Sequence, residues 1–206
     1  MRSAVSALVG ALLLFGAGAA TAATTHTGPR ELVRQTTDEM LSTLKAERKL
    51  IEAEPQRLYE LVNRIIVPHF DFVAMSRWVL GKHWRTATRA QKLRFVRAFR
   101  TLMVRTYATA LLDYTDQEIR YLPMREDISS GDVTVRTEVI QPTGQPVAMN
   151  FRLHLRPKKG WKVYDIAVDG ISLVSNFRTS FATEIKKNGL DALITRLEKR
   201  NAGAEA

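Results

Sequence analysis

The hydrophobic periodicity of the chain changes twice, and these changes constrain the fold more than any other feature. Up to about residue 112, apolar side chains recur every three or four positions, which is the spacing of amphipathic helices. Over residues 132–168 they alternate with polar side chains, which is typical of strands with one buried face. Helical spacing then returns. This order predicts an α+β fold, with helices packed on a curved antiparallel sheet.

The expected sheet has about four strands. They are predicted over residues 119–124, 132–139, 147–156 and 161–168. In the last strand we expect Tyr164, Ile166 and Val168 to face inward, because this phase keeps the carboxylate of Asp165 out of the core. Asp169-Gly170 is expected to end the sheet.

Local signals mark the ends of the expected helices. The helical segments lie over residues 28–48, 55–67, 71–81, 89–112, 174–189 and 193–197. Asp71 is expected to cap the third segment. Thr88 and Gln91 have the spacing of a capping box before the fourth, which is the longest.

The first residues have the order of a secretory signal peptide. Arg2 precedes an apolar run that is too short and too rich in glycine and alanine for a membrane anchor, and small residues at positions 20–22 provide a cleavage site. The expected division is a signal peptide over residues 1–22, a single domain over residues 23–200 and a disordered tail over residues 201–206. The exported protein is expected to be soluble and periplasmic.

The amino-acid composition limits the kinds of catalytic site, metal site and partner that the chain can have. The 206 residues contain no cysteine, which excludes disulfides, thiolate catalysis and Cys-ligated metals. The 31 basic and 21 acidic residues give a net charge of +10, which favours anionic partners. Basic side chains gather around the start of the longest helix, at Arg85, Arg89, Lys92, Arg94, Arg97 and Arg100. Because an exported chain does not meet nucleic acid, they form either a solvated face or a contact for lipid phosphates and acidic partner surfaces.

The sequence gives little evidence for a catalytic site. No nucleotide motif occurs, and the four histidines share no metal-ligand spacing. His69, Asp71 and Ser76 have the residue types of a hydrolase triad, but the surrounding helix offers no nucleophile elbow. Asp165 and Asp169 are either an acid/base pair or a turn former with an edge acid. We expect no catalytic residue, no metal and no cofactor.

Several segments together resemble one protein family in order and spacing over most of the chain. They are Val67-Pro68-His69-Phe70-Asp71-Phe72 with Met75, Leu80-Gly81 and Trp84, then Phe95, Phe99 and Tyr107, Trp161-Lys162-Val163-Tyr164-Asp165, Asp169-Gly170-Ile171-Ser172-Leu173, Asn176-Phe177-Arg178 with Phe181, and Gly189-Leu190 with Leu193-Ile194. The family is that of the periplasmic phospholipid carriers of the maintenance-of-lipid-asymmetry (Mla) pathway, also called the toluene-tolerance auxiliary family.

The resemblance implies a fold similar to nuclear-transport-factor-like domains, with an apolar cavity that buries acyl chains and leaves the head group in water. It implies a non-enzymatic, monomeric shuttle with phospholipid as cargo. Its partners would be an inner-membrane ABC transporter complex and an outer-membrane lipoprotein complex. Such a carrier is needed because two acyl chains have on the order of 30 methylenes, and exposing them to water costs roughly 20 kcal/mol.

With this resemblance, the apolar faces become a candidate lipid site. From the sheet it takes Val135, Val139, Met149, Phe151, Leu153, Tyr164 and Ile166, and from the longest helix Val96, Phe99, Met103 and Tyr107. Arg178 is the candidate contact for the head group, and the alternative interpretation, which we favour, is a structural ion pair. The alternation itself is equally consistent with a filled core. Two alternatives stay open: a periplasmic enzyme with Asp165 or Asp71 as base, and a protein-binding adaptor.

Overall fold

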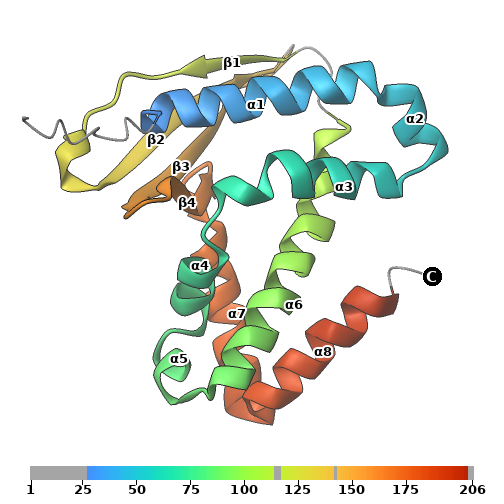
Figure 1. Ribbon diagram of the computed structural model, residues 1–206, viewed down its shortest axis with the longest axis vertical. Coiled ribbons are helices and arrows are strands. Elements are labelled where there is room, and N and C mark those ends of the chain that lie inside the picture. The colour runs from blue at the N-terminus through green and yellow to red at the C-terminus, as the bar shows by residue number, and fades with distance from the viewer. Residues whose placement is uncertain (1–26, 114–116, 142, 204–206) are drawn as a thin grey trace, which may run out of the picture.

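The computed structural model describes residues 27–113, 117–141 and 143–203 (Figure 1). Its helices are α1 (Pro29–Ala46), α2 (Arg48–Ala53), α3 (Gln56–Ile65), α4 (Phe72–Leu80), α5 (Lys82–Thr86), α6 (Arg89–Ala108), α7 (Leu173–Asn188) and α8 (Leu190–Gly203). Its strands are β1 (Glu118–Tyr121), β2 (Asp132–Ile140), β3 (Val147–Arg156), β4 (Gly160–Val168) and β5 (Ile171–Ser172). The expected signal peptide lies outside the described residues.

The strands form one open antiparallel sheet in chain order, β1-β2-β3-β4-β5, within the described part of the chain. The α+β prediction is therefore confirmed, with a fifth strand that was not expected. Asp169 and Gly170 have positive φ angles of 47° and 80°, so they turn the chain back on itself. Ile171 and Ser172 then pair with the end of β4 instead of leaving the sheet.

The elements fall into two parts (Figure 1). The sheet lies at one end with α1 along it, while α4 to α8 gather at the other end. In between, α3 and the C-terminal end of α6 meet. A helical core centred on Phe95 and Phe99 joins α4, α6, α7 and α8. A smaller core seals one end of the sheet, and its members include Val33, Val133, Val135, Leu153 and Trp161.

The predicted helix starts are confirmed at two caps. The Asp71 carboxylate accepts a hydrogen bond from the backbone N–H of Ala74. Thr88 and Gln91 form the reciprocal capping box at the start of α6. These caps satisfy backbone donors that the first helical turn leaves without partners.

Two helix ends and one additional helix differ from expectation. The helix α6 ends at Ala108 and continues as a 3-10 turn over Thr109–Leu111, and α2 was not predicted. The helix α8 runs to Gly203, into the tail expected to be disordered. Asn201 explains this extension, because its buried amide donates a hydrogen bond to the backbone oxygen of Ala98. Residues 204–206 of that tail lie outside the described residues.

The expected phase of β4 is wrong at Tyr164. A register shift between Arg152 and Leu153 opposes Leu153 to Val163 and Phe151 to Ile166, so Tyr164 turns to the other face. Asp165 is buried, contrary to expectation. Its carboxylate accepts hydrogen bonds from the Ser172 hydroxyl and the Val174 backbone N–H, which compensate for the loss of water.

Candidate functional site

On one face of the sheet, the side chains at one end are buried in a core, and those at the other end line an open space. Val133, Val135 and Leu153 are at most 1% exposed. Further along the same face, Val139 and Met149 remain partly exposed although they point between sheet and helices. They are accessible there because they border an open space between the sheet and the helices.

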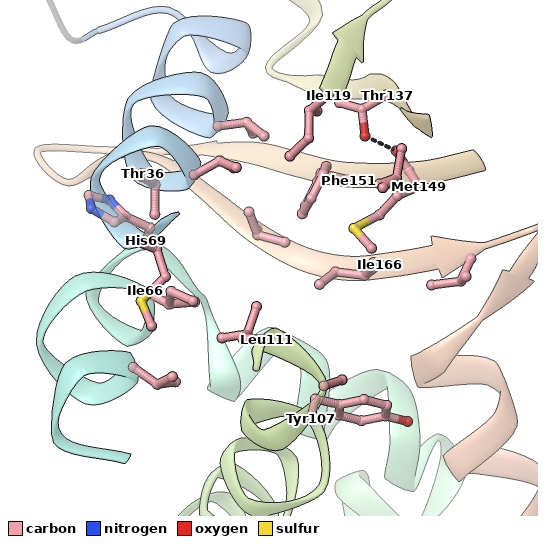
Figure 2. Close-up of a pocket in the computed structure, with 18 of the residues that line it drawn as sticks. Thr36, Ile66, His69, Tyr107, Leu111, Ile119, Thr137, Met149, Phe151 and Ile166 are labelled. Carbon is pink, nitrogen blue, oxygen red and sulfur yellow. Dashed lines mark hydrogen bonds between the residues drawn. The ribbon is translucent and has the colours of Figure 1, made fainter. Parts of the chain in front are cut away.

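The space that they face is a cavity of about 500 Å³ (Figure 2). This volume lies within the usual range of ligand pockets, roughly 300–1,000 Å³. The sheet contributes Ile119, Tyr121, Thr137, Val139, Val147, Met149, Phe151, Val163, Ile166 and Val168. The helices and the turns that follow them contribute, among others, Leu32, Val33, Thr36, Met40, Leu41, Val62, Ile66, His69, Met103, Val104, Tyr107 and Leu111. The lining is predominantly apolar.

Several polar side chains line the cavity, and the environment of three of them is compatible with an apolar space. The Thr137 hydroxyl donates to the backbone oxygen of Met149 at 2.7 Å, so its hydrogen-bonding need is met within the wall (Figure 2). Burial lowers the pKa of His69, and the positive charge of Lys162 lowers it further. Burial also raises the pKa of Tyr107. Both shifts favour neutral side chains in the cavity wall.

Polar groups gather at one end of the cavity. Gln117 and Gln141 flank the pair of Glu118 and Ile140 where β1 begins and β2 ends. The Gln117 amide donates to the backbone oxygen of Asp113, which also lines the cavity. The cavity is thus sealed by hydrocarbon at one end and bordered by amide and carboxylate groups at the other. Such a space suits a molecule with long apolar chains and a polar head.

The structure gathers six of the predicted lipid-site residues around the cavity. They are Met103, Tyr107, Val139, Met149, Phe151 and Ile166. Val135 and Leu153 face the same side of the sheet but belong to its sealed end. Tyr164 lies on the other face, where its hydroxyl donates to Asp132.

The remaining predicted residues lie away from the lining. Phe99 stacks with other aromatic rings in the helical core, and Val96 lies on the preceding turn of α6. Arg178 packs over Gly81, where an added Cβ would come within 3.3 Å of its guanidinium. None of these three side chains is among the described residues that line the cavity.

The sequence reasoning missed the wall formed by α1, α3 and the turn at His69. The apolar spacing of Val33, Met40, Leu58 and Val62 was visible, but spacing does not reveal which surface a helix covers. The helices themselves were predicted, but the sequence did not show that they face the sheet across a cavity.

The alternative catalytic groups have structural roles. The Asp71 carboxylate contacts His154 Nε2 at 3.0 Å and Arg156 Nε at 3.3 Å besides capping α4. Ser76 is completely buried, so a substrate cannot reach its hydroxyl. Asp169 accepts a hydrogen bond from the backbone N–H of Ala148. Within the described residues, no three His, Asp or Glu side chains are grouped so that they could hold a metal ion.

Comparison with known proteins agrees with this geometry. The family model described as MlaC protein matches residues 34–199, which include the cavity walls on both sides. The chain belongs to the MlaC family. Its membership confirms the resemblance drawn from the sequence.

Relatives of this MlaC family member are named for binding and transport. It is 27% identical over 176 residues to the intermembrane phospholipid transport system binding protein MlaC of Haemophilus influenzae, covering 84% of this chain and 82% of that one. It is 31% identical over 164 residues to the toluene tolerance protein Ttg2D of Pseudomonas putida, covering 79% of this chain and 75% of that one.

A solved structure has the same fold. It is the phospholipid-binding protein from Ralstonia solanacearum, determined in complex with a phospholipid at 1.53 Å resolution. It matches this MlaC chain with a TM-score of 0.79 and 34% sequence identity, over 87% of this chain and all of that one. Within the described residues, no helix is long and apolar enough to cross a membrane.

Proposed function

We propose that this protein binds phospholipid and carries it between membranes, with acyl chains in the cavity and the head group at its polar end. The observation that supports this most directly is the accessible apolar wall formed by β1 to β4 and opposed by α1, α3 and α6. Each methylene that leaves water for such a wall contributes about 0.8 kcal/mol. The chains therefore supply most of the binding free energy.

The head group belongs at the end where Asp113, Gln117 and Gln141 line the cavity. Amide groups there can hydrogen-bond to phosphate and ester oxygens without burying a charge. Arg178, the candidate from sequence, packs over Gly81 instead.

The protein works in the periplasm as a monomeric shuttle between an inner-membrane ABC transporter complex and an outer-membrane lipoprotein complex. Support comes from the signal-peptide pattern over residues 1–22 and from the intermembrane transport system named for the Haemophilus influenzae relative. Binding and transport, rather than an enzymatic activity, are the functions for which the relatives are named.

A cavity-filling variant tests the proposal. Val139→Trp places an indole where the wall is accessible, so we expect phospholipid occupancy to fall at least tenfold while thermal unfolding stays cooperative. Val73→Trp is the matched control, because Val73 is exposed on α4 and lies outside the cavity lining. Occupancy is measured by native mass spectrometry after incubation with phosphatidylglycerol liposomes. Equal lipid loading of both variants and the unmodified chain would refute the proposed site.

A further inference from the structure

A second cavity of about 520 Å³ lies behind the first, where α1, α2 and α3 meet the 3-10 turn after α6. Its apolar lining includes Leu44, Ile51, Leu58 and Leu112. It has about the same volume as the first cavity, and the proposed function leaves it without a role.

Two leucine side chains border both cavities. Leu41 of α1 and Leu111 of the 3-10 turn line the first cavity and also the second. Both side chains are only half-buried. Because the cavities share these two residues, they are neighbours separated by hydrocarbon side chains. Partly exposed leucine side chains change rotamer rapidly. An acyl chain could therefore pass from one cavity to the other without burying a polar group.

The second cavity differs from the first in its charge. The exposed side chains of Lys45 and Arg48 line it, together with the carboxylate of Glu52. Arg48 forms an ion pair with Glu52 at 3.2 Å, at the surface of α2. The formal charge of the lining is therefore positive. An apolar interior beside cationic side chains is complementary to an acyl chain that ends in an anionic group.

We propose that the second cavity accepts an acyl chain in addition to those in the first. This inference rests on the proposed function of the first cavity. The chain has two sources to distinguish. One is a second, single-chain amphiphile whose anionic head group faces Lys45 and Arg48. The other is one chain of the bound phospholipid, which passes between Leu41 and Leu111 while its head group stays at the polar end of the first cavity. The chemistry of the cavity is the same for both sources.

The test fills the second cavity without touching the first. Leu112→Trp and Thr109→Trp both introduce an indole from the 3-10 turn and its C-cap, and neither residue lines the first cavity. Leu93→Trp is the matched control, because Leu93 is 53% exposed, Leu112 is 42% exposed, and Leu93 lines neither cavity. The full-length mature protein is loaded with dioleoyl phosphatidylglycerol and then titrated with oleoyl lysophosphatidylglycerol. Native mass spectrometry counts both lipids, after each variant has shown a cooperative thermal transition.

With a separate amphiphile as the source, the loaded protein binds one lysolipid more, and Leu112→Trp and Thr109→Trp weaken that binding at least tenfold. With the phospholipid itself as the source, the lysolipid does not add, and the two variants instead release phosphatidylglycerol to acceptor liposomes at least tenfold faster. In both cases Leu93→Trp behaves as the unmodified chain. Equal behaviour of all three variants in both measurements would overturn the inference. If the unmodified chain failed to load phosphatidylglycerol, the proposed function would fall, and this inference with it.

Discussion

Val135 and Val139 point to the same side of the same strand, yet one is sealed and the other lines a cavity. The difference comes from the opposite layer, because Val33 and Trp161 belong to the core that seals the end of the sheet near Val135. Near Val139 the helices leave space. Alternation in the sequence has the same period in both places, so it predicts an inward side chain but not what that side chain contacts.

Tyr164 and Asp165 show a second limit of sequence reasoning. The expected phase of β4 rested on keeping a carboxylate out of the core. The register shift moved Tyr164 to the opposite face of the sheet, where it is buried against the helical core. A serine hydroxyl and a backbone N–H made the burial of Asp165 tolerable. A bulge carries no clear signal in a single sequence. The guanidinium of Arg152 then lies 5.2 Å from the ring centre of Tyr164.

His69 gives a prediction about pH. Burial holds its pKa below the ordinary value of 6.5, with the charge of Lys162 acting in the same direction and Glu39 opposing. As the pH falls through about 6.5, the unfolded chain binds a proton at this histidine before the folded chain does. The contribution of His69 to the free energy of unfolding therefore decreases on acidification from pH 7.5 to 5.5. We expect the His69→Gln variant to lose less stability over this interval.

Urea denaturation at pH 7.5 and 5.5 gives the change in the free energy of unfolding for the unmodified chain and for His69→Gln. The other titrating groups are common to the two proteins, so they cancel in the comparison. NMR titration of the His69 ring should give a pKa below 6.5. A pKa above 6.5 would contradict the burial of this side chain.

At the scale of elements, the sequence predicted best where local chemistry marks a boundary. Asp71 and Thr88 start α4 and α6 as expected, because a cap depends on residues three positions apart. The end of α8 depends instead on a contact between residues 98 and 201, which no local pattern contains. The α1 and α3 walls of the cavity were missed for the same reason.

The last turn of α8 is open to a direct stability test. Ending the chain after Arg200 removes the hydrogen bond of 2.9 Å from Asn201 to Ala98, so we expect a loss of about 1–2 kcal/mol in the free energy of unfolding. Ending it after Gly203 keeps that bond and serves as the control. If chemical denaturation gave the same midpoint for both, Asn201 would have no anchoring role.

The molecule contains well-packed hydrophobic cores and, between the sheet and the helices, an apolar cavity. The helical core around Phe95 and Phe99 and the sealed end of the sheet are filled by their own buried side chains. The cavity lies between the sheet and the helices that face it (Figure 2). A lipid that binds the folded chain only should therefore raise the midpoint of thermal unfolding.

The length of the acyl chain should govern affinity, because the cavity wall is hydrocarbon. For lysophospholipids that share a head group, we expect affinity to rise about fourfold for each added methylene until the cavity is full. Exchanging phosphoglycerol for phosphoethanolamine at constant chain length should change affinity much less. Competition with a fluorescent fatty acid measures both series. A dependence on head group larger than that on chain length would place the binding energy outside the cavity.

The cavity is proposed to carry phospholipid in the cell. Native mass spectrometry of the protein, purified from bacterial periplasm without detergent, tests it most directly. We predict an excess mass equal to bound phospholipid in stoichiometric amount, which lipid extraction then identifies. A bare protein mass that stays unchanged after incubation with phosphatidylglycerol liposomes would contradict the proposal that the cavity binds phospholipid.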